Sequence, residues 1–174
     1  LEFRRVLFRS LMASISTFAQ TNKSTVKLPI DDNTKLISYN KVIDVTNQSK
    51  DSLFNRVLLW AKSYYKNPYD VIREQNLEEG KIICKARYKI SNPPDKKGFA
   101  SDAGLVQYTL KFICTDQKIS LLITDINWKQ TSYYACEKWM DTSNQYYKTE
   151  FEYYLQQVDA NTKEIIKNIS KEIR

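Results

Sequence analysis

The chain has 174 residues, of which 42% are hydrophobic and 27% are charged, and this composition predicts one soluble globular domain. It contains no histidine, which excludes catalytic triads with an imidazole base and H-E-x-x-H metalloprotease helices. Its three glycines are not spaced as a phosphate-binding loop requires, and its three cysteines offer neither a disulfide framework nor a four-ligand zinc site. We therefore expect no cofactor, no metal and no enzymatic activity.

The N-terminal residues are predicted to lie outside the folded domain. Residues 1–10 carry three arginines, and most of this stretch is what a common sequencing adapter encodes when it is translated in frame; the alternative is the basic n-region of a signal peptide. Residues 11–19 resemble the end of a signal peptide, with Thr17 and Ala19 at the −3 and −1 positions of a cleavage site. We expect a soluble protein exported to the periplasm or cell envelope, with a single domain over residues 20–174.

Part of the basic charge belongs to this terminal stretch. The whole chain carries 27 basic and 20 acidic residues, a formal net charge of +7. Residues 1–20 contain three of the arginines and one of the glutamates, so 24 basic and 19 acidic residues remain beyond them, a net charge of +5. The overall basicity is therefore a weak argument for nucleic-acid binding.

Hydrophobic periodicity predicts the elements in chain order. Residues 36–45 are typical of a strand, and a helix over residues 49–65 follows, with Ser49 as its N-cap and Asn67-Pro68 as its stop. Four further strands are predicted over residues 69–76, 81–90, 105–114 and 119–128. Residues 129–146 show no clear period, and residues 147–173 form an amphipathic C-terminal helix.

Alternation within the strands predicts a sheet with one buried face. Apolar side chains alternate with polar ones, and the expected core positions are Ile82, Cys84, Ala86, Tyr88, Ile90, Val106, Tyr108, Leu110, Phe112, Cys114, Ile119, Leu121 and Ile123. The fold class is therefore α+β, a five-stranded, mostly antiparallel sheet with two helices on one face, in the order β-α-β-β-β-β-α. In this register Cys84 and Cys114 are too far apart for a disulfide, and Cys136 is expected to be the one thiol that is quickly labelled in the native protein.

Two groups of residues are candidates for binding. The polar face of the sheet carries four basic residues that suit an anionic polymer, namely Lys85, Arg87, Lys89 and Lys111. An aromatic group suits sugar rings or a partner protein, namely Tyr133, Tyr134, Trp139, Tyr146 and Tyr147. The alternative for each group is a solvated or partly buried surface without a ligand.

Four short motifs resemble those of a known family. They are Leu28-Pro29-Ile30-Asp31, Ile37-Ser38-Tyr39-Asn40-Lys41-Val42, Leu53-Phe54 with Trp60, and Gly80-Lys81-Ile82-Ile83. Over residues 28–128 the chain resembles domain of unknown function 4468, which implies a TATA-binding-protein-like (TBP-like) fold and an exported protein of Gram-negative bacteria. The family has no assigned catalytic residues, and a fold shared with a DNA-binding protein does not imply DNA binding.

These observations favour a non-catalytic binding or structural module of the cell envelope, whose partner is an envelope protein or an anionic polymer. The alternative is a cytosolic single-stranded nucleic-acid-binding domain that uses the basic sheet face. A hydrolase is a third hypothesis, and it requires Asp125 to converge with a second carboxylate in a pocket.

Overall fold

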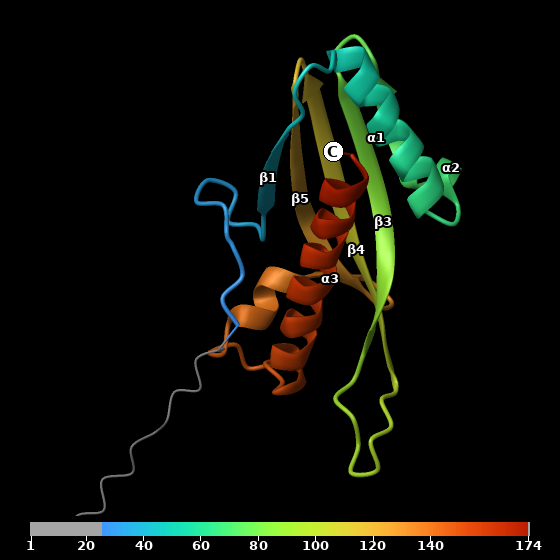
Figure 1. Ribbon diagram of the computed structural model, residues 1–174. Coiled ribbons are helices and arrows are strands. Elements are labelled where there is room, and N and C mark those ends of the chain that lie inside the picture. Colours follow the sequence, from blue (N-terminus) through green and yellow to red (C-terminus); the bar gives the residue numbers. More distant parts are fainter. Residues whose placement is uncertain (1–25, 174) are drawn as a thin grey trace, which may run out of the picture.

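The computed structural model describes residues 26–173, so the adapter-like residues 1–10 and the signal-like residues 11–19 lie outside the described part of the chain. A single antiparallel sheet has the strand order β1-β5-β4-β3-β2, with β6 also paired to β5 (Figure 1). The strands are β1 (Tyr39–Asp44), β2 (Ile72–Asn76), β3 (Lys81–Ser91), β4 (Asp102–Thr115), β5 (Lys118–Lys129) and β6 (Tyr133–Ala135). The helices are α1 (Lys50–Tyr64), α2 (Pro68–Val71), the short 3-10 helix η1 (Cys136–Met140) and α3 (Glu150–Glu172).

The predicted α+β class and element order are confirmed, since α1 and α3 both lie on the same face of the sheet (Figure 1). The strand predicted over residues 69–76 is partly wrong. Its first residues form the short helix α2, in which Pro68 occupies the first turn, a position where its missing N–H costs nothing. The segment without a clear period contains β6 and η1.

The hydrophobic core lies between the sheet and these two helices. Every core position predicted from the alternation in β3, β4 and β5 is buried, except that Tyr88 is half-buried. Trp60 of α1 is buried against Phe112, with ring centroids 5.8 Å apart, and its Nε1 donates to Oδ1 of Asn168 at 2.8 Å. This single side chain therefore joins α1 to both β4 and α3.

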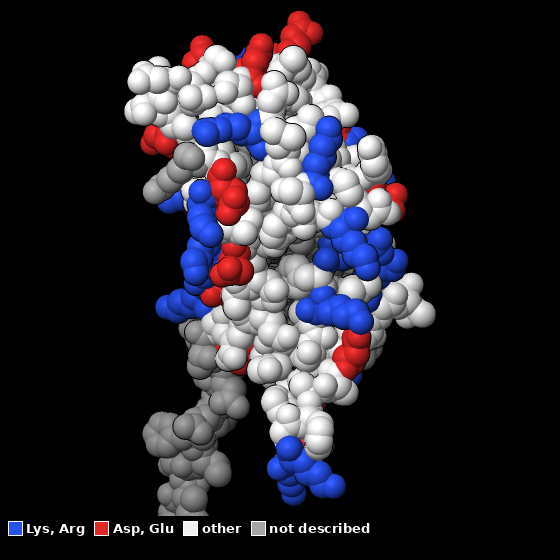
Figure 2. All heavy atoms as spheres, turned by 45° about the vertical axis from the view of Figure 1, so that its right-hand side comes forward, with Lys and Arg blue, Asp and Glu red and all other residues white. Residues whose placement is uncertain are grey.

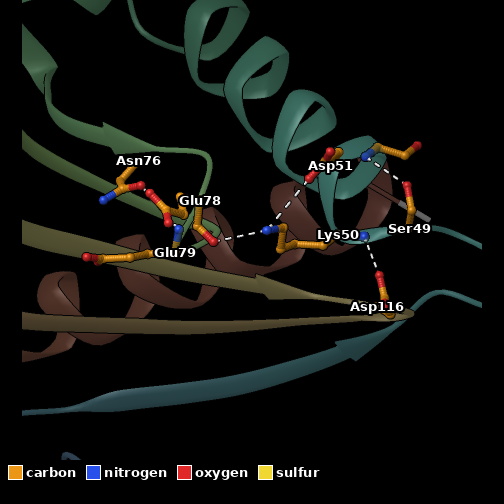
Figure 3. A network of polar contacts seen from close by, with 8 residues as sticks. Ser49, Lys50, Asp51, Asn76, Glu78, Glu79 and Asp116 are labelled. Carbon is orange, nitrogen blue, oxygen red and sulfur yellow. Dashed lines mark hydrogen bonds and ion pairs between the residues drawn. The ribbon is translucent and has the colours of Figure 1, made fainter.

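The N-terminus of α1 is fixed to two turns of the sheet (Figure 3). The Ser49 hydroxyl accepts a hydrogen bond from the Ser52 amide at 3.3 Å, which confirms the predicted N-cap. The backbone amide of Lys50 donates to Oδ1 of Asp116 in the β4–β5 turn at 2.8 Å. The side-chain Nζ of Lys50 donates to the carbonyl of Glu78 in the β2–β3 turn at 2.9 Å. These bonds set the position of α1 along the strands.

The β2–β3 turn ends in a glycine that no other residue can replace without strain. Gly80 has a φ of +65°, and its carbonyl accepts a hydrogen bond from the amide of Cys114 at 2.8 Å. A Cβ at this position would lie 2.2 Å from the Cys114 carbonyl oxygen, which belongs to the backbone of a central strand. Both the conformation and the space therefore require glycine.

We expect Gly80→Ala to lower the free energy of unfolding by roughly 3 kcal/mol, because a left-handed conformation and a backbone overlap both penalise the added methyl group. The melting temperature should fall by about 10 °C, measured by calorimetry. Gly98→Ala is the matched control, since Gly98 has a φ of +86° but nothing within 4 Å of a Cβ, and it should cost only about 1 kcal/mol. Equal losses in the two variants would contradict the close approach of Gly80 to Cys114.

All three cysteines are free and buried. The predicted register is confirmed, since Cys84 lies opposite Leu110 while Cys114 bonds to Gly80. The prediction that Cys136 is exposed is wrong, because it begins η1 and has an exposed fraction of 0%. Burial raises the pKa of the Cys84 thiol to about 12 and that of Cys114 to about 11, and it raises the pKa of Cys136 well above its usual value.

We expect no cysteine to react quickly with a thiol reagent in the native protein at neutral pH, because the reactive thiolate is both scarce and inaccessible. All three should be modified within the same time once denaturant unfolds the chain, as read by intact mass. Rapid single modification of the native protein, mapped to Cys136, would show that η1 opens without global unfolding.

Candidate functional site

The candidate site is the sheet face that α1 and α3 leave uncovered. We call it the open face; it comprises the odd-numbered residues of β3, those of β4 from Leu105 onward, and the even-numbered residues of β5 from Lys118 to Thr124, together with Ser38, Asn40 and Val42 beside them. Apolar residues on it are partly exposed, with Val42 at 50% and Ile113 at 42%. Side chains here are placed by strands that are paired along their length, so they stand in fixed rows.

The structure brings the four predicted basic residues to this face. Lys85, Arg87 and Lys89 are exposed and alternate along β3, and Lys111 is half-buried on β4, two positions from Thr109, which lies opposite Lys85. Lys89 pairs with Asp102, its Nζ 3.6 Å from a carboxylate oxygen. Within residues 26–173 no ion pair engages Lys85 or Arg87. Figure 2 shows basic side chains gathered at mid-height to the right of centre, on the side where β3 borders the sheet.

A hollow of about 340 Å³ opens on the same face beside the start of β1. It is lined by Asp31, Thr34, Leu36, Ser38, Asn40, Lys111, Leu122, Thr124 and Asp125. The hydroxyls of Ser38 and Thr124 lie 3.2 Å apart within hydrogen-bonding distance, and both residues are buried. We call the four basic residues of the open face, Lys85, Arg87, Lys89 and Lys111, the basic row. Lys111 therefore belongs to the basic row and also lines this small polar hollow.

Two carboxylates, those of Asp31 and Asp125, line this hollow, as the hydrolase hypothesis requires. The Asp31 carboxylate accepts hydrogen bonds from the Thr34 amide at 2.7 Å, from the Thr34 hydroxyl at 2.9 Å and from the Asn33 amide at 3.1 Å. The bonds from Thr34 are the main cause that lowers the pKa of Asp31. A general acid needs a raised pKa, so the role of Asp31 here is to hold its own turn.

Asp125 occupies a β-bulge that the alternation does not predict. Between the pairs Gln107–Asn127 and Thr109–Thr124, β5 carries one residue more than β4. Asp125 takes a φ of +52°, a conformation that costs a non-glycine residue free energy, and Ile126 takes the core position instead. The sequence signal for the bulge is the shift of apolar residues from odd positions up to Ile123 to even positions from Ile126.

The aromatic residues predicted as a second patch do not form one surface. Trp139 has an exposed fraction of 0% and stacks on Phe151 of α3, with centroids 5.6 Å apart. Tyr134 and Tyr147 are half-buried and also pack against Phe151. The prediction is wrong for Trp139, which α3 covers completely, a contact between distant segments that local sequence does not encode. Tyr134 and Tyr147 keep part of their surface exposed.

The two remaining tyrosines are exposed but lie apart. Tyr133 of β6 is 54% exposed, and its hydroxyl donates to Oε1 of Gln107 at 3.2 Å, which places it at the end of the open face. Lys129 lies over the Tyr133 ring, 5.8 Å from its centroid. Tyr146 is exposed in the loop before α3. Tyr133 therefore lies on the open face, although the sequence analysis grouped it with the aromatic residues that pack under α3.

Comparisons with known proteins support the fold. No curated protein matches the chain. A crystal structure of a DUF4468 family protein from Bacteroides ovatus has a TM-score of 0.68 at 13% identity, covering 84% of this chain and 90% of that one. A TBP-like protein from Parabacteroides distasonis has a TM-score of 0.64 at 15% identity, covering 83% of this chain and 96% of that one.

The resemblance found over residues 28–128 is confirmed by a sequence match over residues 39–129, more than half of the chain, which runs from the first residue of β1 to the last of β5. The matched segment includes α1, β3, β4 and β5, and so the basic row and most of the open face. The chain belongs to the family described as "Domain of unknown function (DUF4468) with TBP-like fold".

Proposed function

We propose that this protein is a non-catalytic binding module of the cell envelope, and that it binds an anionic partner on the open face. The observation that carries the proposal is the pair of exposed, unpaired cations on β3. Lys85 and Arg87 project to the same side about 7 Å apart, and no acidic side chain of the described residues pairs with either. An anionic ligand would relieve their repulsion and gain charge-assisted hydrogen bonds from both.

The face also offers a way to hold such a ligand in position. Lys111 extends the positive charge across the sheet from β3 to β4, up to the rim of the hollow beside β1. The carboxylates of Asp31 and Asp125 line that hollow and would repel an anion, so the ligand is expected along the cations and not inside the hollow. Because β3, β4 and β5 are central or long strands, these groups are held in place before binding, which lowers the entropy cost of association. A repeating anion or an acidic protein segment fits this row better than a single small ion.

The envelope location is supported by the sequence of residues 11–19, with its apolar stretch and cleavage-site pattern. Within residues 26–173, no helix is long and apolar enough to cross a membrane. The partner classes that suit this location are an envelope protein and an anionic polymer.

Replacing Lys85, Arg87, Lys89 and Lys111 with serine should abolish this binding without unfolding the protein. None of the four contributes to the core, so each change should alter stability by no more than about 0.5 kcal/mol. We expect the parent protein to be retained on dextran sulfate or alginate beads at low salt and released as the salt concentration rises. At low salt, the fraction of the variant that stays on the beads should be at least tenfold smaller than that of the parent protein.

The matched control replaces Lys41, Lys62, Lys167 and Lys171 with serine, since these exposed lysines lie away from the open face and the net charge changes equally. It should behave like the parent protein. If both variants lost retention on the beads equally, the interaction would depend only on the net charge of the protein, and the proposal would be contradicted. Stronger retention on a single-stranded oligonucleotide than on either polysaccharide would instead favour the nucleic-acid-binding alternative.

A further inference from the structure

The border of the sheet at β3 is only partly covered by its neighbouring strand. β3 has 11 residues, but β2 pairs with it only from Lys81 to Cys84. Figure 1 shows β3 continuing past α2 with no strand on its outer side. Across residues 26–173, the pairing with β2 ends at Ile72 and Cys84, so no strand lies against Arg87 and Lys89 on this border. An open strand border of this length is a template for a further strand.

The backbone groups that face outward can be identified from the end of this border. The side-chain amide of Gln157 in α3 bonds to both backbone groups of Ser91: its Nε2 donates to the carbonyl at 2.9 Å, and its Oε1 accepts from the amide at 3.0 Å. An added strand would make the same pair of bonds. Since alternate residues of a strand point their backbone groups to the same border, those of Lys89, Arg87 and Lys85 also face outward.

These same three residues carry the basic side chains of the open face. A residue that pairs with one of them would place its own side chain beside it, about 5 Å away on the same face. Pairing of two copies of β3 would oppose basic residues to one another and is therefore disfavoured. A strand with acidic residues at these positions gains an ion pair at each, so the border selects an acidic partner and rejects its own copy.

The intervening side chains of an added strand would point to the helix side of the sheet. There a hollow of about 300 Å³ lies between the end of α1 and α3, lined in part by Tyr64, Tyr65, Tyr88, Tyr108 and Ile165. These rings and the isoleucine offer apolar contacts to an aliphatic side chain, while Lys66, Asn161 and Glu164 line the rest of the hollow with polar groups. Arg87 lines the same hollow, so the basic row and this hollow meet at the border of β3.

We propose that an extended segment of another protein, with acidic residues alternating with apolar ones, binds as an additional strand along Lys85 to Ile90. This inference rests on the proposed function and names its partner as a polypeptide. The added strand continues the line of β2, spans about six residues or 20 Å, and ends where Gln157 already occupies Ser91. Backbone hydrogen bonds give the affinity, and the alternating pattern gives the specificity.

The test uses a fluorescent peptide in which glutamate and valine alternate between terminal threonines, titrated into the full chain. We expect saturable binding to the protein, and binding at least tenfold weaker for a scrambled peptide of the same composition and for the peptide with lysine in place of glutamate. Amide exchange followed by NMR should slow at least tenfold at Arg87 and Lys89 when the peptide is added. The amides of Ala86 and Tyr88 already face β4 and should change little.

Backbone methylation separates strand addition from attraction between charges. Methylating the glutamate amides removes the donors that face β3 and should abolish binding, whereas methylating the valine amides, which face solvent, should preserve it. In the protein, Arg87→Glu should weaken binding of the acidic peptide and strengthen that of the lysine peptide. Lys41→Glu, on the border strand β1 at the other side of the sheet, is the matched control and should change neither.

Each alternative outcome has a defined meaning. Equal binding of the two methylated peptides, or unchanged exchange at Arg87 and Lys89, overturns strand addition while leaving an anionic partner on the open face. Retention on polysaccharide beads without any binding of the acidic peptide also overturns it. Failure to bind either the beads or the peptide overturns both this inference and the proposed function.

Discussion

Two helices supply enough apolar surface to cover only one face of this sheet, and each strand residue is placed according to that limit. Burying one leucine or isoleucine gains roughly 1.5–3 kcal/mol, whereas an exposed ion pair gains less than about 1 kcal/mol. The side of each residue is therefore decided by the apolar positions, such as Ile82 and Leu110, which are fully buried. The basic row stands on the other face as a consequence of this burial, whatever it binds.

The two helices that bury one face of the sheet are also bonded to each other. Trp60 bonds to Asn168, and a guanidinium nitrogen of Arg56 donates to the carbonyl of Ile173 at 3.1 Å, so α1 and α3 are fastened to each other as well as to the sheet. Side chains of the open face stand on these same paired strands. A binding surface on central strands gives up adaptability, but it spends little entropy when a ligand arrives.

Sequence reasoning located elements wherever one local rule determined them. Helix α1 was expected over residues 49–65 and runs from Lys50 to Tyr64, because Ser49 caps it and Pro68 follows it. The same reasoning failed where segments distant in the chain decide the outcome. Trp139 is buried because α3 folds back over η1, and the bulge at Asp125 is visible only as a change of phase between two short apolar series. The hollow beside β1 combines residues 31–40 with Lys111 and residues 122–125, which are far apart in the chain, so no local pattern could reveal it.

The three buried thiols have a consequence for how the protein matures. In an oxidising compartment a chain with an odd number of reduced cysteines is exposed to mispairing until its thiols are shielded. Cys84 and Cys114 belong to strands joined by a single hairpin connection, and contacts of this local kind form early and fast. Cys136 lies in η1, which packs against α3. At the proposed envelope location, the burial of all three thiols would supply the protection from mispairing that a permanent disulfide provides in exported proteins.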